Sequence, residues 1–181
     1  MQIPAGTDDY FYQTTSAPGY ADLFDVNLHI DLSNAITGEQ VSPATPEFVD
    51  MTYGLVRVTR DPSDVLIVSR AYDCNLRLIE HAVGVISSAS GQRAFVPGPS
   101  AYYGADGTFA VPVLPDVRGD TNTNGLIGFF NVPVATGDYI QLWGFPDDAS
   151  VAQGEAGLVL VAEYPLTPAA QLLGFPLYAN R

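Results

Sequence analysis

The chain has 181 residues, which is the size of a single domain and enough for a substantial core. With 20 acidic and seven basic residues its formal net charge is −13, which repels phosphate backbones and anionic headgroups and so argues against nucleic-acid and membrane-surface roles. A single cysteine excludes a disulfide within the chain, and no apolar run is long enough to span a bilayer.

Short β-branched and aromatic runs between glycine and proline clusters predict an all-β protein. Residues 1–20, rich in Tyr, Thr, Gly and Pro, are expected to form an extended N-terminal arm or an edge segment. Residues 25–32 alternate strictly between apolar and polar side chains, as a half-buried strand does. Further strands are expected over residues 53–59, 65–72, 82–88, 108–113, 126–132, 138–143 and 157–164.

Eight or nine strands at this spacing predict one antiparallel β-sandwich domain over residues 21–164. Residues 91–120 are mostly turn-forming and are expected to be a long loop insertion, the kind of segment in which function often resides. The C-terminal tail, residues 165–181, is expected to hold one helical turn around residues 169–173.

Two stretches carry a family pattern. Residues 65–85 combine a strand, an Asp-containing turn and a return strand, and residues 121–142 combine a Thr-Asn-Thr-Asn-Gly turn, an apolar strand, an Asn-Val-Pro corner and a further strand. Together they resemble the carboxypeptidase regulatory-like domains, over roughly residues 65–164. The resemblance implies a prealbumin-like, Ig-like β-sandwich that serves as a non-catalytic accessory or structural domain of an exported protein, in an extracellular or cell-envelope location.

The pair Asn124–Gly125 predicts a tight turn between two antiparallel strands. Residues 120–125 also match the opening of an EF-hand calcium loop, but its twelfth position is Asn131 instead of glutamate, and no flanking helices are expected. A turn held by Asn and Asp side chains is therefore the first interpretation. The alternative is a weak calcium site formed by Asp116, Asp120, Asn122 and Asn124.

The sequence contains no recognisable catalytic constellation: it lacks a Gly-x-Ser-x-Gly elbow and a phosphate-binding Gly-x-x-x-x-Gly-Lys loop. Its two histidines, His29 and His81, lie on separate segments. A metal-dependent hydrolase or dioxygenase built on these two imidazoles is retained only as a third alternative.

We therefore expect a non-catalytic structural or binding subunit of an exported or cell-surface assembly, acting through protein–protein contacts, either with a protein partner or by self-association. A carbohydrate- or calcium-dependent binding module is the alternative, and no cofactor other than weakly bound calcium is expected. Aromatic side chains in the arm and beside loops are the expected partner-binding residues: Tyr10, Phe11, Tyr12, Tyr102 and Tyr103.

Overall fold

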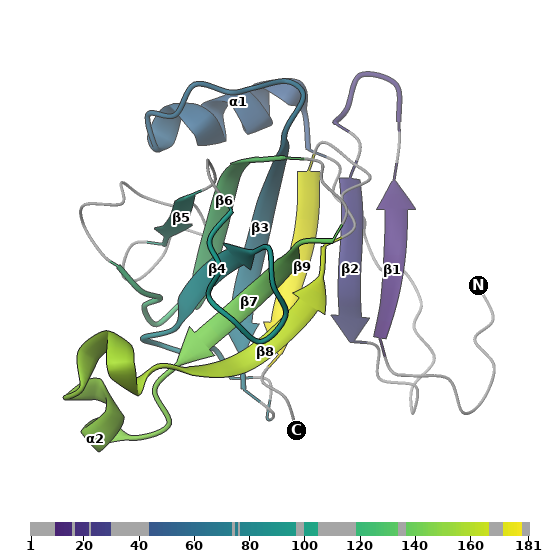
Figure 1. Ribbon diagram of the computed structural model, residues 1–181. Helices are drawn as coiled ribbons and strands as arrows, with labels where there is room; N and C mark the ends of the chain where they lie inside the picture. The colour runs from purple at the N-terminus through teal and green to yellow at the C-terminus, as the bar shows by residue number, and fades with distance from the viewer. Residues whose placement is uncertain are drawn as a thin grey trace, which may run out of the picture.

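The computed structural model describes residues 10–15, 17–21, 23–29, 44–73, 75, 77–96, 100–104, 119–133, 137–166 and 172–178. These residues are mostly β, as the sequence predicts, and their strands form two sheets (Figure 1). The strands are β1 (Tyr10–Thr15), β2 (Leu23–His29), β3 (Val65–Tyr72), β4 (Val83–Ser87), β5 (Ser100–Tyr103), β6 (Leu126–Val132), β7 (Tyr139–Gly144), β8 (Val159–Pro165) and β9 (Leu172–Tyr178). The helical elements are α1 (Pro46–Leu55), α2 (Asp148–Val151) and the 3₁₀ turn η1 (Gly154–Gly157), and none of these is long and apolar enough to cross a membrane.

The larger sheet has the strand order β1-β2-β9-β3-β6-β5. Its C-terminal strand β9 lies between β2 and β3 and runs parallel to both (Figure 1). The other neighbouring strands of this sheet are antiparallel, so the expectation of a wholly antiparallel architecture is wrong at β9. Parallel neighbours need a long crossover, and here the chain runs through the smaller sheet before β9 returns beside β3.

Both predicted flanking segments contribute strands to this sheet. Within the tail, residues 172–178 are a strand and not the end of a helical turn, because Leu172–Tyr178 pairs in register with Leu66–Tyr72. Within the arm, residues 10–15 form β1, which pairs with β2 at the edge of the sheet. Strand β1 of the arm and strand β9 of the tail therefore belong to the same sheet as β3 and β6 of the predicted domain core.

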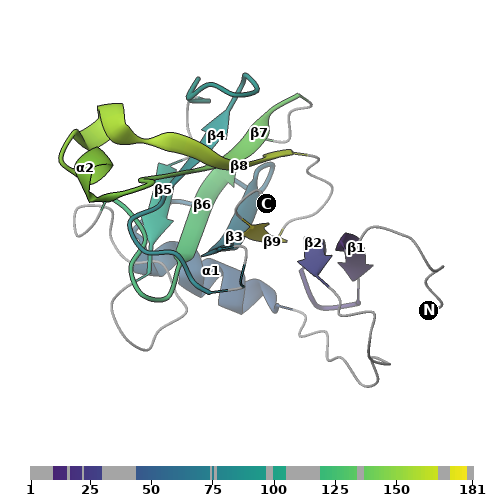
Figure 2. The ribbon, with the colours of Figure 1, turned by 90° about the horizontal axis from the view of Figure 1, so that it is seen from below.

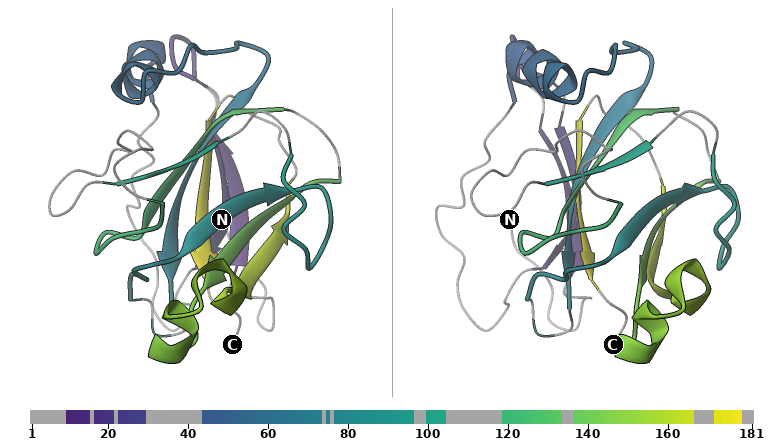
Figure 3. Two further views of the ribbon diagram at one scale, coloured as in Figure 1. Left: turned by 60° about the vertical axis from the view of Figure 1, so that its left-hand side comes forward. Right: turned by 90° about the vertical axis from the view of Figure 1, so that its left-hand side faces the viewer.

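The smaller sheet has the order β4-β7-β8 and packs against one face of the larger sheet (Figure 3). Consecutive strands divide between the sheets: β3 lies in the larger and β4 in the smaller, and β6 and β7 divide in the same way. The return strand expected within residues 65–85 therefore lies in the other sheet, although an antiparallel bridge between Tyr72 and Leu78 follows β3 directly. The strand expected over residues 108–113 lies outside the described residues, while β5 lies within the predicted long loop.

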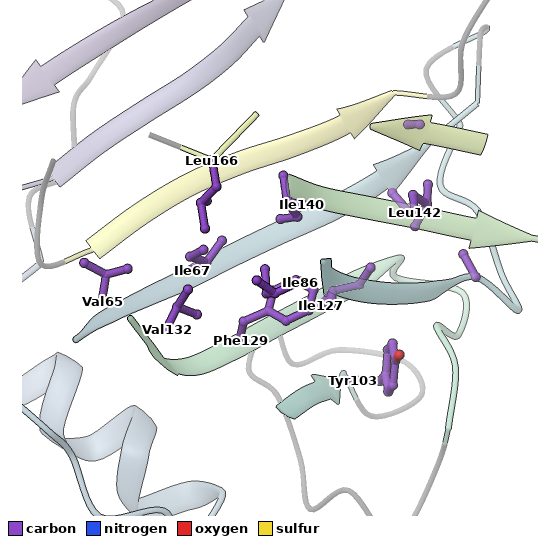
Figure 4. Close-up of a cluster of buried hydrophobic side chains, with 13 residues drawn as sticks. Val65, Ile67, Ile86, Tyr103, Ile127, Phe129, Val132, Ile140, Leu142 and Leu166 are labelled. Carbon is purple, nitrogen blue, oxygen red and sulfur yellow. The ribbon is translucent and has the colours of Figure 1, made fainter. Parts of the chain in front are cut away.

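The main core fills the space between the two sheets (Figure 4). Alternation along β3 directs Val65, Ile67 and Ala71 to this core, and the intervening Leu66 belongs to a second cluster on the opposite face. The core between the sheets consists of Val65, Ile67, Ala71, Ala82, Ile86, Tyr103, Ile127, Phe129, Val132, Ile140, Leu142, Ala162 and Leu166.

A β-bulge at Asn131 returns the end of β6 to the core between the sheets. Val65 pairs with Val132 and Ile67 with Phe129, so β6 has one residue more than β3 over this stretch. Asn131 has a φ of 51° and takes up the extra residue. As a result Phe129 and Val132 both reach the core between the sheets, and the side chain of Asn131 binds the backbone of the loop before β3.

Helix α1 covers the other face of the larger sheet (Figure 2). Thr45 is its N-cap and accepts a hydrogen bond from the backbone N–H of Phe48 at 3.2 Å, and Pro46 follows at the first helical position. Val49, Tyr53 and other side chains of one face pack on the sheet. The strand expected over residues 53–59 is therefore wrong: three of its residues end a helix, and the rest lead into the loop before β3.

Candidate functional site

The predicted calcium-loop opening is a turn held by its own side chains. The Asn122 amide group donates to the carbonyl of Gly104, and its oxygen accepts from the N–H of Asn124 at 3.0 Å. The Asn124 side-chain oxygen accepts from the N–H of Leu126 at 2.9 Å. The side-chain oxygens of both asparagines therefore accept hydrogen bonds from backbone N–H groups. These hydrogen bonds explain why asparagine is found at both positions of the turn.

Of the two acidic members of the predicted site, Asp120 lies in the described part of the structure. The Oδ2 atom of Asp120 lies 3.1 Å from Nδ1 of His81. Asp116 lies outside the described residues. In the part of the chain that the structure describes, no three His, Cys, Asp or Glu side chains converge on a site for a metal ion. The other histidine, His29, lies at the end of β2.

The turn at Asn124–Gly125 is present, but it does not close a hairpin. The Gly125 N–H donates to the carbonyl of Asn122 at 2.9 Å, and Gly125 has a φ of 59°. Before the turn, Thr121 pairs with His81 and Ala82, whereas β6 after the turn pairs with β3 and β5. The turn therefore connects a segment that pairs with residues 81–82 to a strand that pairs with β3 and β5.

Tyr102 and Tyr103 are core residues, which corrects their expected role at a partner-binding surface. Tyr102 is 8% exposed and meets Phe130 edge to face, with 5.0 Å between ring centroids. Tyr103 is 4% exposed, its hydroxyl accepts from the N–H of Gly84 at 3.2 Å, and burial raises its pKa to about 12. Alternation along β5 directs the two rings into different cores.

The remaining predicted partner residues, Tyr10, Phe11 and Tyr12, lie on β1. Their backbones belong to the strand that pairs with β2, and their side chains lie outside the described part of the structure.

A polar network covers the outer face of the smaller sheet. Glu163 on β8 accepts from the Ser90 hydroxyl at 2.6 Å, from the Gly91 N–H at 2.7 Å and from the Gln141 amide group at 2.6 Å. Burial pushes the pKa of Glu163 upward, but these hydrogen bonds outweigh it and hold the pKa below its ordinary value. The network therefore fixes the loop after β4 onto β7 and β8.

Trp143 belongs to this network, and both its indole N–H and its ring have partners there. Its indole N–H donates to the side-chain oxygen of Gln141 at 2.9 Å, and the guanidinium of Arg93 lies 5.3 Å from the ring centroid. Arg93 also donates to the carbonyl of Glu155 at 3.2 Å. An arginine held at this distance over the ring leaves less of it for stacking a sugar, so this cluster does not favour a carbohydrate site.

Helix α1 presents a row of apolar side chains to solvent. Phe48 is 47% exposed, Met51 52% and Leu55 48%. Their spacing of three and four residues places them in one row along the helix. We call Phe48, Met51 and Leu55 the α1 row. The sequence interpretation missed it because residues 53–59 were expected to be a strand, although Thr45-Pro46-Glu47 is a helix N-terminus signal.

Charged and small residues border the α1 row. Glu47 lies in the first turn of the helix, and Arg57 follows its C-terminal end with a φ of 56°. Neither side chain forms an ion pair with another described residue, whereas Asp50 pairs with Arg60 at 2.8 Å. Gly54 is exposed on the same helix, and a Cβ built on it meets nothing within 4 Å.

Comparison with known proteins adds no relative: no protein-family model, no curated protein and no solved structure matches the chain.

Proposed function

We propose that this protein is a non-catalytic structural or binding subunit that acts through protein–protein contacts, and that the α1 row is its contact surface. The observation that carries the proposal is the exposure of Phe48, Met51 and Leu55 in one line. Single exposed apolar residues are ordinary on a soluble surface, but a contiguous row is typical of an interaction site.

A partner that covers the α1 row removes apolar surface from water, which favours association. Each Å² of apolar surface removed from water contributes about 25 cal/mol, so three long side chains covered together contribute several times what one does. Met is also common at protein-binding surfaces because its unbranched chain adapts to a partner. On the same helix, Val49, Tyr53 and Val56 already supply the contacts that hold α1 to the sheet, so the α1 row is not needed for that packing.

The proposed fold type is a prealbumin-like β-sandwich, supported by the two sheets that share a core and by the resemblance over residues 65–164. The parallel strand β9 is an addition to such an arrangement. The proposed setting, an exported or cell-surface assembly, rests on the same resemblance.

A position-specific crosslink tests the contact surface. A photo-reactive amino acid is placed at Met51, and in a second chain at Val151 on α2, which is the matched control because the two residues are 52% and 50% exposed. Irradiation in the cells or secretions that contain the protein should give a discrete adduct from position 51 and none from position 151. Equal labelling at both positions, or no adduct at position 51, would contradict the proposal.

A further inference from the structure

We infer that the partner of the α1 row is a second copy of this chain, with the two α1 helices packed antiparallel about a two-fold axis. This inference rests on the proposed function, since it names the partner of the same surface. Three features of α1 carry it: the order of the apolar residues, the order of the charges, and the position of a glycine.

The α1 row is self-complementary when it is inverted. Its residues are Phe48, Met51 and Leu55, so its midpoint along the helix lies between residues 51 and 52. A two-fold axis through that midpoint places Phe48 of one copy opposite Leu55 of the other and brings the two Met51 side chains together. Every exposed apolar side chain of the row then meets an apolar side chain, as a two-fold interface requires.

The charges at the ends of α1 match the same arrangement. Glu47 precedes the row and Arg57 follows it. In the antiparallel pair, Glu47 in the first turn of one helix lies at the same end of the pair as Arg57 of the other copy, which follows that copy's helix C-terminus. The two-fold axis forms this pairing twice. A parallel pair would instead set Glu47 against Glu47, so the charge order selects the antiparallel direction.

Gly54 lies beside the α1 row, and its missing side chain leaves room for a second helix to approach α1 closely. It lies three positions after Met51, is exposed, and has no neighbour within 4 Å of an added Cβ. Its φ is not positive, so its backbone does not require glycine. Glycine destabilises a helix relative to alanine, and no packing within the described chain accounts for it here. A second helix crossing at this point would use the missing side chain to approach more closely.

The net charge of the chain disfavours non-specific association, so a dimer would need a specific contact surface. Each copy carries a formal charge of −13, which opposes contact between arbitrary faces. On the α1 surface, exposed apolar side chains lie in sequence between an acidic and a basic residue, in an order that inverts onto itself.

The first test is the mass in solution as a function of protein concentration, measured by sedimentation equilibrium up to about 1 mM. The wild-type chain and Val151→Glu should form a dimer with the same dissociation constant, and Met51→Glu should raise that constant at least about tenfold. Circular dichroism and melting of each variant check that the fold is retained. A wild-type chain that stays monomeric throughout, or a Met51→Glu variant that dimerises like wild type, overturns the inference.

The charge order gives a second, independent test. Glu47→Arg alone and Arg57→Glu alone should each weaken the dimer about three- to tenfold, because each sets like charges together, and the double variant should recover most of the loss. Gly54→Ala should raise the melting temperature at monomer concentrations through its helix propensity and yet weaken the dimer. Absence of recovery in the double variant contradicts the antiparallel pairing.

The crosslink at position 51 separates this inference from the proposed function. An adduct of twice the chain's mass supports both. An adduct with a different protein, together with a monomeric chain, overturns the second-copy inference and leaves the proposed function standing. No position-specific adduct and no dimer would overturn both.

Discussion

At the residue scale, Gly84 marks a close approach of the two sheets. A Cβ at this position would lie 2.7 Å from the ring of Phe129 and 2.9 Å from Ile127, both on β6 of the opposite sheet. Neither side chain has free space to move into, because both are essentially fully buried in the core between the sheets. A side chain on residue 84 would therefore have to push the two sheets apart.

Gly84→Ala is accordingly expected to lower the free energy of unfolding by about 1–3 kcal/mol. Urea denaturation followed by fluorescence measures the change. Gly119→Ala is the control, since a Cβ there meets nothing within 4 Å, and it should leave the stability within about 0.5 kcal/mol of wild type. Equal stabilities of the two variants would show that the sheets do not meet at Gly84.

Glu163 makes the stability of the molecule sensitive to acid. Its pKa in the folded protein lies below the ordinary 4.5 because hydrogen bonds from Ser90, Gly91 and Gln141 outweigh the opposing effect of burial. A lowered pKa stabilises the fold at pH values above 4.5, and this contribution is lost as the pH falls through the folded-state value.

Glu163→Gln should therefore cost about 1 kcal/mol at neutral pH, through weaker hydrogen bonds to the loop after β4. The difference between wild type and variant should shrink as the pH falls below 4.5. Glu155→Gln serves as the control, because the Glu155 side chain is exposed and only its carbonyl contacts Arg93. A pH-independent difference for Glu163→Gln would mean that its charge does not hold the network.

At the element scale, the turn before β6 depends on Gly125 for two separate reasons. Its φ of 59° is unfavourable for residues with a side chain, and an added Cβ would lie 2.9 Å from the backbone oxygen of Ala71. Gly137 also has a positive φ, of 101°, but a Cβ there meets nothing within 4 Å. Substitution of Gly137 therefore adds backbone strain alone, whereas substitution of Gly125 adds strain and a steric clash with Ala71.

Gly125→Ala is expected to destabilise the protein by more than Gly137→Ala does, with the strain alone costing on the order of 1 kcal/mol at each position. Thermal melting of the two variants beside wild type measures both losses. If the two variants melted at the same temperature, the contact between Gly125 and Ala71 would be too loose to exclude a methyl group.

Helix α1 shows why element type was harder to predict than strand position. Residues 53–59 include aromatic and β-branched side chains that suggest a strand, but Thr45 caps a helix, and Val49, Tyr53 and the C-cap residue Val56 pack on the sheet. The helical assignment is decided by the larger sheet, which offers an apolar face for α1 to cover. Over so short a segment, burial against a neighbour outweighs local preference.

At the scale of the whole molecule, β9 holds the larger sheet together. It pairs with β3 along Leu66–Tyr72 and with β2 through Leu23–Asp25. Within the larger sheet, β1 and β2 are joined to the other strands through β9. The last described strand of the chain is therefore central to the sheet, whereas β1 is an edge strand.

A chain that ends at residue 166 is consequently expected to lose cooperative unfolding, because β3 would keep only β6 as a neighbour, and β1 and β2 would lose their connection to the rest of the sheet. Removing residues 1–16 takes away the edge strand β1 and should leave a cooperative transition at a lower denaturant midpoint. A synthetic peptide of residues 167–181 should restore cooperativity to the first chain. A sharp, unchanged transition in the chain that ends at residue 166 would show that β9 is dispensable.

The sequence by itself determined where several strands lie. Residues 65–72 and 126–132 are β3 and β6 with the predicted bounds, and the strands expected near 82–88, 138–143 and 157–164 are present within one or two residues. These features follow from local chemistry, because β-branched and aromatic runs favour extended backbone, and glycine and proline end them. The positive φ of Gly125 is predictable for the same reason.

Only the tertiary structure decided how those strands combine. Which sheet takes β4 or β7, the parallel position of β9, the burial of Tyr102 and Tyr103, and the exposure of the α1 row all depend on partners far away in the chain. A strand's sequence sets its alternation but not its neighbour, because pairing and burial are contacts between segments that local preference does not encode. The candidate surface on α1 can be identified only when it is known which face of the helix packs on the sheet.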